Sequence, residues 1–475
     1  MGTISSAFSI ISQALNSGQA ALNIVANNVA NANTPGYTEE TPAWRQNQPI
    51  EANGIQYGMG ASVTSSVSLR DRVLNERLDQ QQQLASASSA RLTALDSVQA
   101  LFTPDSGSAS ATAGDIGSDI TGFFNSFSSL EANPTDNALR QGVLSKASTL
   151  AGDVSNAAAS LNSQRSALDQ EAFGVTSQVN ALTGAIAQLN HQIQSTSPNS
   201  DAGTLEDQRQ QDLSQLSKLI GVNQISTENN GLSITTTSGQ LLVSEGSSFQ
   251  LTTGTVNGVT NFFLGGADIT SQLATGGGQL GGYLTARDQD IPAVLSSLDQ
   301  LAYSVSTSVN AQNNAGTDQS GLTGTAANPL YIFSQPAAGQ VSGSAAAMSV
   351  VMTDPGKIAA AGAGNGTGDN SNAAAMAALA NQPIVAGQPP IDSFSNFVSN
   401  LGSTVASVQT ENTAQNASVT QLQTQSDALS GVNLNDEASA LTTLERSYQA
   451  ASQVFAMLNT IMSSALNLGV QTAVS

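Results

Sequence analysis

Residues 21–40, ALNIVANNVANANTPGYTEE, begin as an apolar helix and stop abruptly at Thr34-Pro35-Gly36-Tyr37. Asparagine is a weak helix former, and five of the residues between 23 and 33 are asparagines. The apolar positions nevertheless continue a strict four-three alternation that starts near the N-terminus. Its members are Ile4, Phe8, Ile11, Leu15, Gly18, Leu22, Val25 and Val29. This spacing predicts one apolar seam along a helix of about 40 Å, too weak to persist without a packing partner.

The C-terminal end carries a matching seam. Asn435-Asp436-Glu437 supplies a helix start with acidic residues in its first turn, which complements the helix dipole. The seam that follows comprises Leu441, Leu444, Tyr448, Ala451, Phe455, Leu458, Met462 and Ala465. Neither terminal helix can bury its seam alone. We therefore expect the two to pack against each other or against neighbouring copies of the chain, and we favour self-assembly.

Three interior seams occupy residues 168–193, 291–309 and 394–429, and weaker helical patterns cover 69–101 and 135–165. We expect these interior seams to form ordinary core. The period changes to two between residues 222 and 273, where short alternating runs are separated by Gly-containing turns. Val256-Asn257-Gly258-Val259 is the strongest hairpin signal among them. Residues 313–390 are rich in Gly, Ala, Asn and Pro, which favours irregular structure.

The predicted fold class is mainly α with a β insertion: an elongated, multi-domain, discontinuous chain with its termini at one end. Its expected parts are a terminal α-helical coiled-coil assembly domain (1–60 plus 431–475), a helical-bundle rod (61–220 plus 279–312 plus 391–430), a small antiparallel β-rich domain (221–278) and an irregular outer surface segment (313–390).

The composition argues against several functional classes. With 34 acidic and 13 basic residues, the formal net charge is −21, which disfavours nucleic acid and anionic membrane surfaces as partners. The chain has no cysteine, so thiolate metal sites and disulfides are excluded. No Lys or Arg precedes Arg45, so the start of the chain lacks the basic region of a cleaved signal peptide.

Catalytic candidates are few, and we expect no enzyme activity, cofactor or metal. His191 is the only histidine, and it lies two residues beyond a seam position, which predicts a solvent-facing side chain. Gly276, Gly278 and Gly281 fit a G-x-G-x-x-G pattern, but without the surrounding elements of a dinucleotide fold we interpret them as a flexible turn. The pairs Glu39-Glu40 and Asp436-Glu437 are interpreted as a solvated turn and a helix start rather than as acid-base groups.

The opening stretch resembles the N-terminal signature of the axial proteins of the bacterial flagellum, the rod, hook and hook-associated proteins. The positions that carry the resemblance are Asn27, Asn28, Asn31, Pro35, Gly36 and Tyr37. The C-terminal stretch from Ser430 to Gly469 is similar to the matching terminal helix of that family, and its opening SGVNLNDE points to the hook-associated branch. Interior segments 205–222, 276–316 and 352–370 are similar to that branch as well.

The resemblance implies a structural subunit at the hook-filament junction that assembles helically into a ring. It implies the hook protein below, a second hook-associated junction protein above, and an assembly interface made by the two terminal seams. It also implies secretion by the flagellar type III export apparatus to an extracellular position, without a cleaved signal peptide, and a cytoplasmic export chaperone on the C-terminal helix.

Two other interpretations stay open at this stage. A hook or distal-rod protein shares the terminal signatures, although SGVNLNDE and the long helical interior disfavour it. A secreted adhesive or enzymatic protein on an axial scaffold is the alternative from another class. The single histidine and the missing catalytic motifs disfavour the enzymatic version. An adhesive role of the insert over residues 221–390 stays open.

Overall fold

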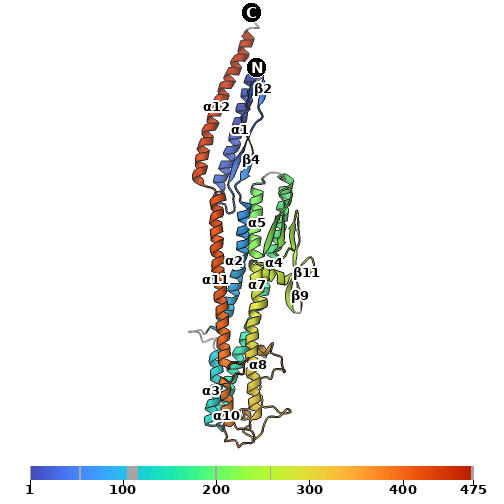
Figure 1. Ribbon diagram of the computed structural model, residues 1–475, viewed down its shortest axis with the longest axis vertical. Coiled ribbons are helices and arrows are strands. Elements are labelled where there is room, and N and C mark those ends of the chain that lie inside the picture. The colour runs from blue at the N-terminus through green and yellow to red at the C-terminus, as the bar shows by residue number, and fades with distance from the viewer. Residues whose placement is uncertain (1, 53–54, 104–115, 198–200, 257, 472–475) are drawn as a thin grey trace.

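The computed structural model describes residues 2–52, 55–103, 116–197, 201–256 and 258–471. The molecule is long and narrow, with both ends of the chain at the same extremity (Figure 1). Two helices and a β ribbon form that terminal part. A bundle of long helices forms the rod below it, a β part lies on the side of the rod, and loops gather at the far tip. The expected elongated architecture is therefore present.

The elements follow one another in a simple order. The terminal part contains α1 (Gly2–Asn31), β1 (Glu40–Gln46), β2 (Ile50–Ala52), β3 (Ile55–Tyr57), β4 (Ala61–Ser68) and α12 (Leu434–Gln471). The rod contains α2 (Arg72–Phe102), α3 (Ile116–Ala132), α4 (Asn137–Thr196), α5 (Thr204–Leu219), α7 (Gly278–Thr285), α8 (Ile291–Ala315) and α11 (Pro390–Ser430). Short helices α6 (Thr270–Gly276), α9 (Ser344–Ala347) and α10 (Ser371–Ala378) complete the set.

The rod helices begin where the sequence supplies a cap. Asp71 and Asp136 each accept two backbone N–H groups of the first turn, at the starts of α2 and α4. The 60 residues of α4 span about 90 Å, so this one helix connects the tip with the β part. Its predicted seam is buried at Ala172, Val179 and Ile186, which are almost inaccessible to solvent. The seams of α4 and α8 are thus core, as expected, whereas the seam of α11 is buried only in its first half, at Phe394, Leu401, Val405 and Val408, and Leu429 at its end is 58% exposed.

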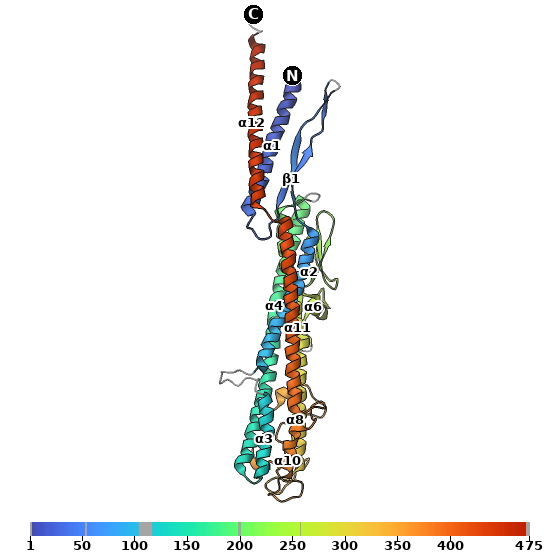
Figure 2. The ribbon, with the colours of Figure 1, turned by 60° about the vertical axis from the view of Figure 1, so that its left-hand side comes forward.

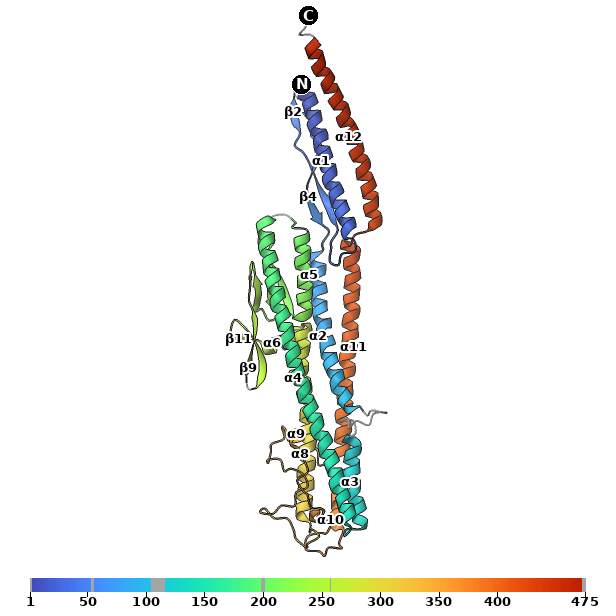
Figure 3. The ribbon, with the colours of Figure 1, turned by 180° about the vertical axis from the view of Figure 1, so that it is seen from behind.

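The β part consists of two antiparallel sheets on the side of α4 (Figure 3). The first contains β5 (Val222–Ser226), β6 (Leu232–Thr236), β7 (Leu241–Ser244) and β8 (Ser247–Ser248); the second contains β9 (Leu251–Val256), β10 (Val259–Leu264) and β11 (Ala267–Asp268). Val256 pairs with Val259 across the predicted hairpin, whose Asn257 lies outside the described residues. Leu241 and Phe249 are 36% and 43% exposed at the surface of this part.

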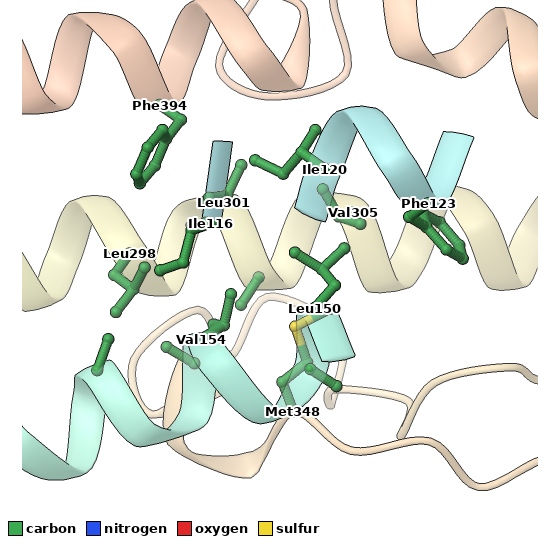
Figure 4. Packing of buried hydrophobic residues seen from close by; sticks show 14 of the residues in the cluster. Ile116, Ile120, Phe123, Leu150, Val154, Leu298, Leu301, Val305, Met348 and Phe394 are labelled. Carbon is green, nitrogen blue, oxygen red and sulfur yellow. The ribbon is translucent and has the colours of Figure 1, made fainter. Parts of the chain in front are cut away.

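The tip has a substantial apolar core (Figure 4). Phe123 and Leu150 meet residues of α8 there, and Met348 enters from the loops between α8 and α11. Segment 313–390 was expected to be a surface segment without a large core. It is irregular, but Ile332, Phe333 and other side chains are fully buried in the same cluster as the helices. The reason is that short apolar groups separated by Gly and Pro can be buried without any periodic element.

Two further expectations were wrong. The terminal domain over residues 1–60 was predicted to be helical, yet β1 pairs with β4 and β2 pairs with β3 in a long ribbon that crosses residue 60. The Gly-rich stretch at 276–281 was interpreted as a flexible turn, but it packs tightly. A Cβ on Gly278 would lie 2.5 Å from the backbone of Ile220, and one on Gly281 would lie 2.9 Å from the carbonyl oxygen of Leu273. Glycine here permits close packing of α7 on its neighbours.

Candidate assembly interface and joint

The two terminal helices lie side by side, which brings the two predicted seams together (Figure 2). The rings of Phe8 and Phe455 are 4.7 Å apart. Gly18, the interruption in the N-terminal seam, faces Tyr448, and a Cβ at this position would lie 3.4 Å from the tyrosine ring. The glycine therefore makes room for an aromatic side chain on the partner helix.

Burial along α12 follows the predicted spacing. Seam positions are half-buried, while the residues between them are mostly exposed. The half-buried set comprises Leu441, Leu444, Tyr448, Ala451, Phe455, Leu458 and Met462 on α12, and Phe8, Ile11, Leu15 and Leu22 on α1. Only Val25, at 4% exposure, is a fully buried apolar member among the described side chains of the two seams. A single copy thus covers its seams incompletely.

Three predicted seam positions differ from this picture. Val29 is 43% exposed, because the chain turns away beyond the last turn of α1. Ala465 is exposed, because α12 extends past the start of α1. Ile4 lies within α1, but its side chain is outside the described part. A second apolar stripe on α12 is also open to solvent; it consists of Val454, Met457 and Ile461, exposed by 40%, 59% and 52%.

The β ribbon covers another side of α1. Asn47 donates from Nδ2 to Oε1 of Gln13 at 2.8 Å, and the N–H of Val63 donates to Oγ of Ser17 at 3.3 Å. These bonds join the ribbon to polar side chains of the helix. The ribbon was missed because its residues include Pro42 and Pro49 and lack a long apolar alternation.

Asn28 of the signature stretch joins three distant parts of the chain. Its side chain is 1% exposed and has all its hydrogen-bonding positions occupied. Nδ2 donates to the carbonyl oxygen of Glu40 at 2.8 Å and to Oε1 of Glu437 at 2.9 Å. Oδ1 accepts the hydroxyl of Tyr37 at 2.8 Å and the N–H of Glu40 at 3.1 Å. One amide thereby ties the end of α1 to the loop, to β1 and to the first turn of α12.

The other signature positions shape the loop that follows α1. Asn31 donates to the carbonyl oxygen of Asn27 at 3.0 Å within the last turn. Gly36 has a φ of +79°, a conformation that a side chain would strain. Partial burial, together with the carboxylates of Glu40 and Asp207, raises the pKa of Tyr37 to about 12. Its hydroxyl therefore keeps its proton and acts as a donor.

The same loop is anchored to the rod through Asp207. Thr38 donates from its hydroxyl to Oδ1 of Asp207 at 2.9 Å. Arg70 donates to the same oxygen at 2.6 Å and to Oε2 of Glu206 at 2.6 Å. The Arg70 side chain is 5% exposed, so these charges are largely removed from water. We call this cluster of Asn28, Thr38, Arg70, Asp207 and Glu437 the joint, because it connects the terminal part with the rod.

Neither a metal-binding group nor a membrane-spanning helix is found in the described part of the chain. Among those residues, no group of three His, Cys, Asp or Glu side chains could hold a metal ion. His191 is exposed on α4, as expected, beside the turn at Gly246. Within the same residues, none of the helices has both the length and the apolar character needed to span a membrane.

Two protein families match parts of the sequence. Residues 106–327 match the family described as Flagellar hook-associated protein FlgK helical domain. Residues 10–38, which contain the signature stretch, match the family described as Flagella basal body rod protein. The first match covers much of the rod and the β part, and the second covers most of α1 and its following loop.

Comparison with individual proteins also finds flagellar hook-associated proteins. The chain is 26% identical to flagellar hook-associated protein 1 of Escherichia coli (strain K12), over 96% of this chain and 98% of that protein. It is also 26% identical to the protein of that name from Bacillus subtilis (strain 168), over 66% of this chain and 68% of that one. The solved structure of the flagellar hook junction protein FlgK from Burkholderia pseudomallei shares the fold over 74% of this chain and 99% of that chain, with a TM-score of 0.64 and 19% identity.

Proposed function

We propose that this chain, which belongs to the flagellar hook-associated protein family, is the structural subunit that joins the flagellar hook to the filament. It is a component of the axial structure of the bacterial flagellum. The observation that carries the mechanism is the incomplete burial of the paired seams of α1 and α12. A subunit whose terminal helices cover each other only in part retains apolar surface for neighbouring copies.

The terminal helices act as the assembly interface. An exposed stripe beside the seam of α12 is formed by Val454, Met457 and Ile461. This helix therefore has one apolar surface for α1 of the same copy and a second apolar surface for a neighbouring copy. Burial of such residues contributes about 1.5–3 kcal/mol per large side chain. Repeated around a ring, these contacts hold the terminal parts together, with the rod and the β part farther from the axis. The hook protein binds below this ring and a second hook-associated junction protein binds above it.

The weak helix propensity of the signature stretch suits this mechanism. Asparagine-rich turns fold reluctantly in isolation and become stable when the seam is buried. A chain that folds fully only on assembly can be kept unfolded during export by the flagellar type III apparatus, without a cleaved signal peptide. A cytoplasmic chaperone that covers the C-terminal seam prevents premature association, and the subunit reaches an extracellular position.

The proposal is tested with a matched pair of variants in a strain that lacks the native gene. Leu22→Asp places a charge in the seam, whereas Asn23→Asp places the same charge at the exposed neighbouring position. We expect Asn23→Asp to restore filaments and Leu22→Asp to leave hooks without filaments, although the protein is made and its rod is folded. Equal numbers of filaments with both variants would refute assembly through the seams.

A further inference from the structure

A cleft lies next to the joint, on one side of α2. It has a volume of about 380 Å³ and is bounded by α2, α5 and the end of α11, with the loop from Pro35 to Thr38 at its rim. Most of its lining is polar, and Leu78 supplies an apolar patch in its floor. The cleft is thus formed by elements of the rod next to the terminal part.

Asp79 in the floor of this cleft has an acceptor without a partner. The residue is 1% exposed. Its Oδ2 accepts from Nε2 of Gln210 at 2.9 Å and from Nε2 of Gln224 at 2.9 Å, whereas its Oδ1 is buried with no hydrogen bond. Burial raises the pKa of Asp79 to about 7, although both glutamine bonds oppose the rise. A buried oxygen of this kind favours a donor that arrives from outside.

The charges around the cleft favour a cationic guest. Asp427 lies on its rim, where Oδ1 accepts from Nε2 of Gln423 on the same helix, at 2.8 Å. Lys218 on α5 is the one basic residue of the lining and lowers the pKa of Asp79 through its charge, while Glu76 on α2 raises it. Asp427 balances the ammonium of Lys218, and the carboxyl of Asp79, with a pKa of about 7, adds a partial negative charge near neutral pH, so the cleft favours a guanidinium or ammonium group.

The opposite face of α2 carries such a group. At about 100° per residue, Arg77 lies ~200° around the helix from Asp79 and only ~3 Å away along the axis. Val73 and Leu84 share its face and are 61% and 47% exposed, and Arg77 itself is exposed. Among the described residues Arg77 forms no ion pair. One helix therefore presents a cation with apolar flanks on one side and an anionic cleft at the same height on the other.

We propose that Arg77 of one copy binds in the Asp79–Asp427 cleft of the next copy, with Val73 and Leu84 covering the rim. The proposal rests on the proposed function, because it assigns a second contact within the same ring. Two different faces of one subunit at equal height make a heterologous contact, which propagates from copy to copy and closes in a ring. A chain with a net charge of −21 repels its own copies, so a complementary pair of charges has a specific use here.

Cysteine cross-linking in assembled flagella tests the contact directly, because the chain has no cysteine of its own. The full chain with Arg77→Cys and Asp427→Cys is expressed in place of the native gene, and isolated hook-filament structures are treated with a short bismaleimide. We expect a ladder of dimers, trimers and higher multimers, since a heterologous contact continues beyond two copies. Lys146→Cys with Asp427→Cys is the matched control, because Lys146 is exposed near the tip. It should give no ladder.

Charge reversal provides an independent measurement. Arg77→Glu and Asp427→Arg should each lower the number of filaments at least about tenfold, because like charges then face each other. The doubly substituted chain should restore filaments, since each interface again pairs opposite charges. A double variant as defective as the single ones, single variants with normal filament numbers, or cross-linking with Arg77→Cys alone would overturn the contact and leave the junction function intact. Absence of the unsubstituted chain from hook-filament structures would overturn both.

Discussion

Replacement of Asn28 by Ala should selectively weaken the joint. The substitution removes four hydrogen bonds and leaves the buried N–H and C=O groups of Glu40 without their partners. Each unsatisfied buried group costs about 1–3 kcal/mol. The better helix propensity of alanine returns about 0.5 kcal/mol. For the two groups of Glu40 the net loss is therefore about 1.5–5.5 kcal/mol, confined to the contact between α1, β1 and α12.

The matched control is Asn27→Ala in the same helical turn. Asn27 is exposed, and its side chain accepts a bond only from Asn31, at 3.2 Å. Both variants gain the same helix propensity, so their difference isolates the buried hydrogen bonds. Hydrogen exchange of the full chain, followed by mass spectrometry, reports on the amide of Glu40. Its protection should fall at least about 30-fold in Asn28→Ala relative to Asn27→Ala, because the two unsatisfied groups cost at least about 2 kcal/mol and each 1.4 kcal/mol is a factor of ten.

The tip core provides the internal reference for this measurement. Amides of α3 and α8, which lie at the far end of the rod, should exchange equally in both variants. Equal protection of Glu40 in the two variants would refute the role assigned to Asn28. A loss of protection that extends to the tip would refute a joint that opens independently of the rod.

Three further predictions concern the same region. Burial raises the pKa of Asp79 from 3.8 to about 7 in the folded chain, so the contribution of this carboxyl group to stability is fully present below about pH 4 and is lost as pH rises through 7. Asp79→Asn should therefore flatten the decline of the melting temperature between pH 5 and 8. An unchanged slope would contradict the assignment. Gly36→Ala should cost about 1–2 kcal/mol in urea unfolding of the terminal part, because the φ of Gly36 is +79°. Gly58→Ala should be neutral, because no atom lies within 4 Å of the new Cβ. Arg70→Ala should destabilise by about 3–5 kcal/mol in the same assay, because it leaves buried carboxylates unpaired. Arg72→Ala should cost at most about 1 kcal/mol, because the Arg72 side chain is 63% exposed. Equal losses would show that burial does not set the energy of these ion pairs.

Periodicity in the sequence was sufficient to predict the long helices and their inward faces. Leu298, Val305 and Val309 are buried at the predicted spacing, because apolar residues on one helical face have no other way to leave water. The β hairpin at Val256–Val259 was equally accessible, since Asn-Gly between alternating strands specifies a tight turn. Local patterns of this kind require no knowledge of distant partners.

The joint could not be predicted in the same way. Asn28 was recognised as part of a signature, but its bond to Glu437 connects positions 409 residues apart, and no local pattern encodes that pairing. The β ribbon was missed because it is a two-stranded element that packs against α1 rather than forming a sheet with its own core. Asp79 lies among glutamines in a polar helix, so its burial depends on how α5 and β5 pack against it.

The central claim is that this chain joins the hook to the filament, and electron microscopy of cells that lack its gene tests this claim most directly. The account predicts hooks of normal length without filaments, together with flagellin in the culture medium. Cells without hooks would place the protein below the junction, and cells with intact filaments would contradict the account.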